Sequence, residues 1–210
     1  LIFAGVVILQ LFSLFKSKKT PKVESLFSDA LNALLNGDKS KAISLLQQVV
    51  KKDTNHVRAY LQLGNILRKE NTDRAIKIHQ SLTVRPNLSP EQKVQIHKAL
   101  AKDYIEIGYT KKAIEEAKKI LLIEKRNLWS LKFMIKVSEE NEDWEAAAIW
   151  SKHLQKVSGK KELNDLSRFD IYKGLDCIRN GKIEDAKSYF KAAIKQSPDN
   201  SQAYKYLGDL

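Results

Sequence analysis

Residues 174–198 read GLDCIRNGKIEDAKSYFKAAIKQSP, and this stretch has the residue spacing of a helical hairpin. Gly174 has no side chain where two helices would cross closely, and Gly181 suits the left-handed turn that would end the first helix. Ala186 is small on the packing face of the second helix, and Pro198 would end that helix. The stretch therefore predicts two antiparallel helices whose fixed points are Gly174, Gly181, Ala186, Phe190, Ala193 and Pro198.

The alanine that opens the second helix of this hairpin recurs along the chain at a nearly regular interval. Successive copies are 33, 38, 34 and 39 residues apart, at Ala42, Ala75, Ala113, Ala147 and Ala186. Two steps are close to a period of ~34 residues, and the two longer ones carry extra residues in RPNLSPEQ and SGKKELND, which read as loops. This pattern resembles the tetratricopeptide repeat, which implies an all-α solenoid of helical hairpins coiled into a right-handed superhelix.

Five such repeats can be traced over residues 25–210, and Tyr204, Leu207 and Gly208 begin a sixth. The second repeat has a short turn, KENTD, without glycine, and the fourth has Ile135 at the crossing position and no turn glycine. An unrelated bundle of amphipathic helices is the alternative, but bundles do not repeat small residues at a fixed period. We therefore expect one repeat array, whose sixth hairpin would continue past the last residue.

The composition agrees with an all-α protein and gives a strong positive charge. Hydrophobic residues make up 43% of the 210 residues and charged residues 30%, which allows a substantial core. Lys and Arg number 37 against 25 Asp and Glu, so the net charge is +12, and four of the lysines stand in residues 16–22. This excess suits an acidic partner or an anionic surface, and charge alone does not choose between them.

The sequence shows no residue pattern for catalysis or metal binding. Its four histidines are scattered over different repeats without HExxH spacing, and no glycine-rich phosphate loop is present. Cys177 is the one cysteine, so it can form neither a disulfide within this chain nor a zinc site with other cysteines. We expect a non-enzymatic binding protein without a cofactor in this stretch.

The first 15 residues, LIFAGVVILQLFSLF, carry no charge and predict a transmembrane anchor. As a helix they would span about 22 Å, short of the ~30 Å hydrocarbon core, so we expect the anchor to begin before Leu1. A basic tether follows over residues 16–24, and lysines directly after a span favour the cytoplasmic side. A cleaved signal peptide is the alternative, although KSKKTPK is not a small-residue cleavage site. The sequence thus predicts a single-pass protein with its repeats in the cytoplasm.

One face of the predicted array carries candidate partner-binding residues. In tetratricopeptide arrays the first helices line the concave surface, and residues beside the small crossing position point into it. Applied here, this rule predicts a basic groove, although lysines are also common on merely solvated helix faces. Phe27 and Leu31 stand where the carboxylate clamp of chaperone-binding repeat proteins would need lysine and asparagine, which argues against that role. The groove residues are Arg58, Asn65, Arg68, Lys98, Lys102, Trp129, Lys132 and Lys136.

A more specific resemblance rests on LGNILRKENTDRAIKIHQSL at residues 63–82, followed by LSPEQ from Leu88 and ALAKDYIEIGYTKKAIE from Ala99. These stretches, with the apolar start and its basic flank, resemble the lipopolysaccharide assembly protein B family, also called YciM. The resemblance implies an adaptor in the bacterial inner membrane that brings LpxC, the deacetylase that commits lipid A synthesis, to the membrane protease FtsH. It also implies a rubredoxin-like zinc domain with two CxxC pairs, which would lie beyond this chain. The alternatives are a generic membrane-tethered scaffold for envelope, pilus or secretion machinery and a soluble periplasmic carrier.

Overall fold

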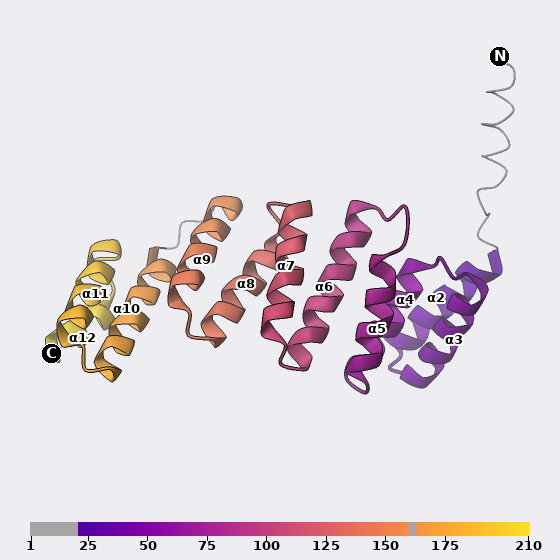
Figure 1. Ribbon diagram of the computed structural model, residues 1–210, viewed down its shortest axis with the longest axis horizontal. Helices are drawn as coiled ribbons and strands as arrows, with labels where there is room; N and C mark the ends of the chain where they lie inside the picture. The colour runs from indigo at the N-terminus through magenta and orange to yellow at the C-terminus, as the bar shows by residue number, and fades with distance from the viewer. Residues whose placement is uncertain (1–20, 160–162) are drawn as a thin grey trace, which may run out of the picture. The chain divides into compact units, whose positions relative to one another are not determined.

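The computed structural model describes residues 21–159 and 163–210, which contain eleven α-helices and no β-strand. The helices follow one another as antiparallel pairs (Figure 1). Contacts between residues divide the chain into two units, Leu1–Asn87 and Leu88–Leu210. The all-α class and the helical hairpins predicted from the sequence are confirmed for the described residues, and a superhelix through the whole array stays a prediction.

The first unit contains the first two repeats, packed on one core. Phe27 and Ala30 of the first repeat are buried together with Leu63 and Ala75 of the second. Each second helix is capped by a side chain, because Asp38 and an asparagine accept hydrogen bonds from backbone N–H groups three residues later. The helices are α2 (Pro21–Leu35), α3 (Lys39–Lys52), α4 (Val57–Leu67) and α5 (Thr72–Thr83).

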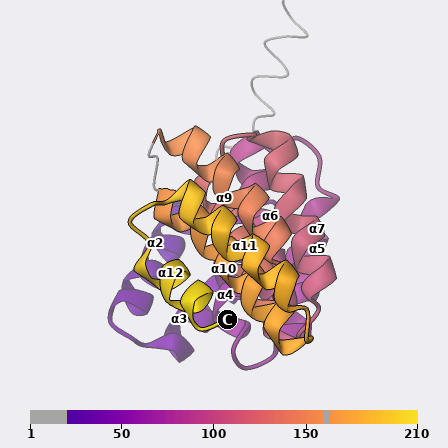
Figure 2. The same cartoon turned by 90° about the vertical axis from the view of Figure 1, so that its left-hand side faces the viewer.

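The second unit contains the third to fifth repeats and the first helix of the sixth. A capping box of Ser89 and Gln92 starts its first helix. Phe190 and Ala203 are buried in a shared core at the C-terminal end, where α10, α11 and α12 lie side by side (Figures 1 and 2). The helices are α6 (Pro90–Glu106), α7 (Thr110–Ile123), α8 (Leu128–Glu140), α9 (Trp144–Ser158), α10 (Leu163–Arg179), α11 (Ile183–Gln196) and α12 (Ser201–Gly208).

Four of the five hairpin turns have the same backbone geometry. Gly37, Gly108 and Gly181 have φ of 71–77° in the first, third and fifth repeats, and Glu142 takes the same place in the fourth with φ of 55°. In each turn the next amide donates to the carbonyl five residues earlier, at 2.8–2.9 Å. The shorter turn of the second repeat has no residue with positive φ. The fourth repeat therefore has the turn geometry of the glycine-containing repeats, with Glu142 at the glycine position.

In the second and fifth repeats, a glycine of the first helix lies against a large side chain of the second. A Cβ atom on Gly174 would lie 2.5 Å from Cε1 of Phe190, and a Cβ atom on Gly64 would lie 2.3 Å from Nε2 of His79. All members of these crossing pairs are buried, and each pair has at least one small residue. Besides these two, the pairs at the corresponding positions, 16 residues apart, are Ala30 with Leu46, Ala101 with Ala117, and Ile135 with Ser151.

The predicted anchor and tether fall at the start of the chain. Residues 1–15 lie outside the described residues, so the transmembrane helix and its topology stay predictions. None of the helices in the described part has the length and apolar character to cross a membrane. Helix α2 begins at Pro21, inside the tether predicted over residues 16–24, and proline is favoured in the first turn of a helix.

Candidate functional site

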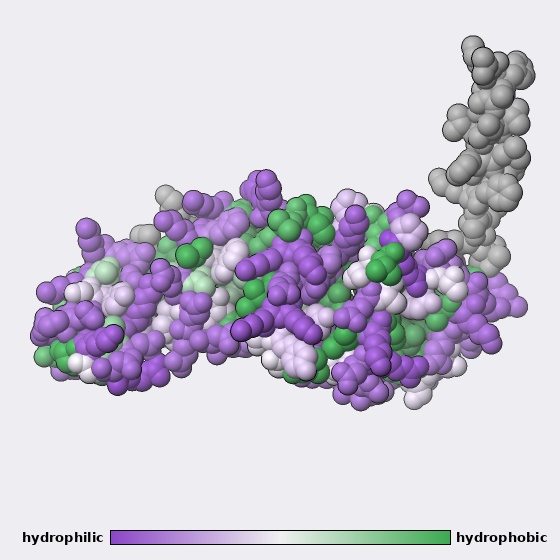
Figure 3. All heavy atoms as spheres, in the orientation of Figure 1, coloured by the Kyte–Doolittle hydropathy of each residue, from purple (hydrophilic) through white to green (hydrophobic). Residues whose placement is uncertain are grey.

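The eight predicted groove residues lie in, or directly after, the first helices of three repeats, and all of them are exposed or half-buried. They fall in two units, so one continuous groove through all eight stays a prediction. The surface seen in Figure 3 is mostly hydrophilic, with scattered hydrophobic patches. The first set is Arg58 and Asn65 on α4 with Arg68 directly after it, and the second is Lys98 and Lys102 on α6 with Trp129, Lys132 and Lys136 on α8.

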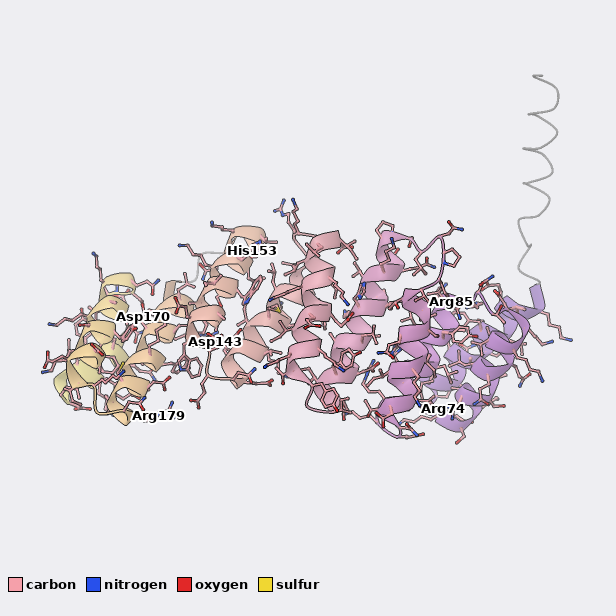
Figure 4. The ribbon with its side chains drawn as sticks, in the orientation of Figure 1. Arg74, Arg85, Asp143, His153, Asp170 and Arg179 are labelled. Atoms are coloured by element: carbon pink, nitrogen blue, oxygen red, sulfur yellow. The ribbon has the colours of Figure 1, made fainter. Side chains whose placement is uncertain are left out.

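In the first unit, the groove residues are held by neighbours on α2 and α4. The guanidinium carbon of Arg58 lies 5.1 Å from the ring centroid of Phe27, which is buried. Arg68 donates a hydrogen bond of 2.7 Å to Asn65. Phe27, which argued against a carboxylate clamp, thus supports an arginine instead. Elsewhere in this unit, the guanidinium carbon of Arg85, a residue labelled in Figure 4, lies 4.2 Å from the ring centroid of Tyr60.

In the second unit, Lys98 of α6 lies over an aromatic pair on α8. The Nζ atom of Lys98 lies 5.0 Å from the ring centroid of Trp129, which stacks on Phe133 at 5.0 Å. Lys136 forms an exposed ion pair with Glu140 at 3.6 Å. The structure therefore brings the predicted residues Lys98 and Trp129 into direct contact, and the ammonium group gains a cation–π interaction without losing its charge.

A cavity of about 220 Å³, here called the cationic cavity, lies between α8, α9 and α10. Lys132 makes no ion pair or hydrogen bond within the described residues, whereas Arg168 donates to a carboxylate oxygen of Glu139 at 2.6 Å. Ser151 takes the place that Phe190 has in the fifth repeat, and its small side chain leaves this space open. The lining residues are Lys132, Ile135, Lys136, Glu139, Ser151, Leu154, Gln155 and Arg168.

Arg168 is absent from the predicted groove, although a signal for it exists in the sequence. It stands six residues before Gly174, as Arg58 stands six residues before Gly64 and Trp129 stands six before Ile135. The rule for groove positions, if carried into the fifth repeat, would have found it.

A second cavity of about 330 Å³, here called the apolar pocket, lies between the start of α9 and the last half of α10. The indole Nε1 of Trp144 donates to Asp176 at 2.7 Å, and its ring lies 4.7 Å from the ring of Tyr172. Arg179, labelled in Figure 4, also lines the pocket, and its ion pairs with Asp176 and Glu142 raise the pKa of its guanidinium. Leu175 and Ile178 complete the lining.

A buried ionic network ties α6 to α7. Nδ1 of His97 and a carboxylate oxygen of Glu116 are 2.6 Å apart, and Lys119 donates to the other oxygen at 2.7 Å. Burial tends to raise the pKa of Glu116, but the hydrogen bonds from His97 and Lys119 outweigh it, so the pKa is lowered. Because these groups satisfy one another and line neither the cationic cavity described above nor the apolar pocket, we interpret the network as structural. The described residues hold no group of three or more His, Cys, Asp or Glu side chains that could bind a metal ion.

Comparison with known proteins supports the fold. The model of the tetratricopeptide repeat family matches residues 173–210, from the crossing glycine of the fifth repeat into the sixth. A tetratricopeptide repeat protein of known structure from Parabacteroides merdae superposes with a TM-score of 0.60 at 17% identity. The match covers 89% of this chain and 71% of that chain. The chain thus has the fold of a tetratricopeptide repeat solenoid.

Curated relatives share one name. Lipopolysaccharide assembly protein B of Escherichia coli K12 is 24% identical over 179 residues, which cover 85% of this chain and 46% of that protein. The chain is similar to lipopolysaccharide assembly protein B. The protein of that name from Haemophilus influenzae Rd is 26% identical over 196 residues, with 86% and 48% covered. The resemblance predicted from residues 63–82 is confirmed and extends over most of the chain, which spans about half the length of these relatives.

Proposed function

We propose that this chain is the repeat array of a non-enzymatic adaptor that regulates lipopolysaccharide synthesis. The tetratricopeptide repeat fold is a scaffold for protein–protein interaction, and the similarity to lipopolysaccharide assembly protein B over most of the chain carries the assignment to lipopolysaccharide. In this proposal the adaptor is anchored in the bacterial inner membrane, with its repeats in the cytoplasm and no cofactor in this stretch.

The partners of the proposed adaptor are the deacetylase LpxC and the membrane protease FtsH. Cations on the first helices α6 and α8 attract an acidic segment of one partner, and Trp129 supplies apolar contact area. A single exposed ion pair contributes only about 0.2–1 kcal/mol, so several cations must act together. Their common field speeds association more than it strengthens the final complex. Bringing LpxC to the protease would limit lipopolysaccharide production.

Charge reversal on the first helices tests this proposal. The variant carries glutamate at Lys98, Lys102, Lys132 and Lys136. Its matched control carries glutamate at exposed lysines of the second helices, namely Lys111, Lys118, Lys152 and Lys191. Both changes alter the net charge equally. We expect the first-helix variant to capture LpxC and FtsH more slowly, with association rates that no longer depend on salt, while the control behaves like the unmodified chain.

Two outcomes would contradict the proposal. A first-helix variant that keeps its helical circular dichroism, still captures both partners and still restrains LpxC in cells would exclude this face. If the unmodified chain captures neither LpxC nor FtsH, the generic scaffold for envelope, pilus or secretion machinery becomes the better interpretation.

A further inference from the structure

The two cavities of the second unit are both lined by residues on one face of the same helix, α10. Arg168 lines the cationic cavity, and Tyr172, Leu175 and Arg179 line the apolar pocket. Because these residues are separated by four, three and four positions, they share one face of the helix. The helix rises about 10 to 15 Å from Arg168 to Leu175 and Ile178, at ~1.5 Å per residue. One extended ligand could therefore reach both cavities.

The cationic cavity suits a carboxylate. Lys132 and Lys136 from α8 and Arg168 from α10 surround it, and within the described residues Lys132 has no counter-charge. Arginine and lysine together bind a carboxylate through charge-assisted hydrogen bonds. Glu139 also lines the cavity and would repel a doubly charged phosphate more strongly than a single carboxylate. A volume of about 220 Å³ limits the occupant to a group of side-chain size.

The apolar pocket is preformed to accept one large apolar side chain. The polar edge of Trp144 is satisfied by Asp176, so the aromatic faces of Trp144 and Tyr172 are left to line the pocket with Leu175. Its volume of about 330 Å³ is at the low end of the ~300–1,000 Å³ typical of pockets for small molecules. The pocket therefore fits a single leucine or aromatic side chain better than a whole cofactor.

We infer that α10, with α8 and α9, binds a linear segment of a partner protein that carries an acidic residue and a large apolar residue about three or four positions apart. That spacing follows from the 10 to 15 Å along α10 and the ~3.3 Å that each residue of an extended chain spans. The inference rests on the proposed function only in requiring a protein partner. It identifies the class of segment that the partner presents.

Synthetic peptides test the inference without any cellular partner. The probes are fluorescent Ser/Gly peptides with a Glu-Glu pair followed after three residues by Phe, and matched peptides in which Gln-Gln replaces Glu-Glu or Ser replaces Phe. Fluorescence anisotropy with the full chain measures Kd. We expect the complete peptide to bind with a Kd below about 1 mM and each matched peptide to bind at least about fivefold more weakly.

Variants of the chain assign the two halves of the site. Lys132→Glu should weaken binding of the complete peptide about fivefold or more, whereas Lys191→Glu, an exposed lysine on α11, should not. Tyr172→Ser should weaken it about tenfold, whereas Tyr204→Ser should not. Tyr172 is 37% exposed and Tyr204 53% exposed, so both variants should fold, which thermal melting checks.

Each result either supports or overturns the inference. Equal binding of the complete peptide and the Gln-Gln peptide excludes the cationic half, and equal binding of the peptide without Phe excludes the apolar half. Absence of binding by the complete peptide overturns the inference. The proposed function is then still tested separately, by capture of LpxC and FtsH. Peptide binding without capture of either partner supports the inference and contradicts the assignment of LpxC and FtsH.

Discussion

The fourth and fifth repeats reach the same hairpin with opposite choices of residue. At the helix crossing, the fifth repeat places Gly174 against the large Phe190, whereas the fourth places the large Ile135 and the small Ser151. At the turn, the fifth repeat uses glycine with φ of 71°, and the fourth holds a glutamate at φ of 55°. The fourth repeat, whose residues follow the tetratricopeptide pattern least, thus has the same turn geometry as the fifth, whose residues follow it most closely.

On the packing face of the first helix, the fourth repeat has the more typical apolar residues and the fifth has charged ones. The fourth repeat buries Leu131 and Met134 there, while the fifth has Asp170 and Lys173 at the corresponding places. Nζ of Lys173 lies 3.8 Å from a carboxylate oxygen of Asp170, and each side chain is 25% exposed. The fifth repeat therefore has the more typical residues at the crossing and the turn, and the fourth has them on the first-helix face. Both repeats share the hairpin turn and at least one small residue at the crossing.

The largest effect should come from the aromatic side of the fifth crossing. Phe190→Ala removes a side chain with no exposed surface, so we expect it to lower the free energy of unfolding by about 3–5 kcal/mol. Ser151→Ala, at the corresponding place of the fourth repeat, should change it by less than about 1 kcal/mol. Urea unfolding followed by circular dichroism measures both. Equal losses would show that the two crossings do not differ in size as described.

Overpacking the glycine side of the same crossing should have the next largest effect. Gly174→Leu puts atoms where Phe190 already lies, which should cost about 1–3 kcal/mol despite the better helix propensity of leucine. Gly208→Leu is the control, because a Cβ atom there meets nothing within 4 Å. Thermal melting compares the two variants, and an unchanged melting temperature for Gly174→Leu would refute the repeat alignment at this position.

Exchanging the turn residues should give smaller effects of opposite sign. Glu142→Gly relieves a side chain from a positive φ and should stabilise the protein by about 1 kcal/mol, while Gly181→Glu should destabilise it by a similar amount. Glu142→Gln keeps the backbone strain and removes the exposed ion pair with Arg179, so it isolates that contribution. Urea unfolding of the three variants checks the signs, and a destabilising Glu142→Gly with a neutral Glu142→Gln would contradict the account.

The smallest effect should come from Asp170 and should depend on pH. Burial raises the pKa of Asp170, and the attraction of Lys173 only partly offsets this. A raised carboxyl pKa costs stability above the folded-state pKa, and the cost disappears as the pH falls below the unfolded-state pKa of about 3.9. Asp170→Asn should therefore stabilise the protein at pH 7 by less than about 1 kcal/mol and should have no effect below about pH 4. A gain that grows toward acidic pH would contradict this sign.

Much of the fold could be predicted because the repeat period is set by small residues, the alanines where helices pack closely and the glycines in the turns. Regular alanines and turn glycines located the hairpins, and the loop RPNLSPEQ, predicted as an insertion, contains Asn87, where the two units separate. The separation itself was not predicted, because it depends on the density of contacts, which composition does not reveal.

The remaining differences have local causes. The short turn of the second repeat shifts its second helix by one position, so His79 takes the crossing place that a fixed spacing would give to its neighbour. The sequence did not predict a positive φ at Glu142. The structure tolerates it because its cost of about 1–2 kcal/mol is small beside the packing of a whole hairpin. The two cavities depend on side-chain volumes from three helices, among them Ser151 and Trp144, which sequence spacing alone does not combine.

The central claim is that the first helices of the second unit bind the partner. Hydrogen–deuterium exchange of the full chain, with and without saturating purified LpxC, tests this claim most directly. We expect slower exchange in α6, α8 and α10 on binding and unchanged exchange in α7 and α11, the second helices that line neither cavity. Protection confined to the second helices, or no protection anywhere, would contradict it.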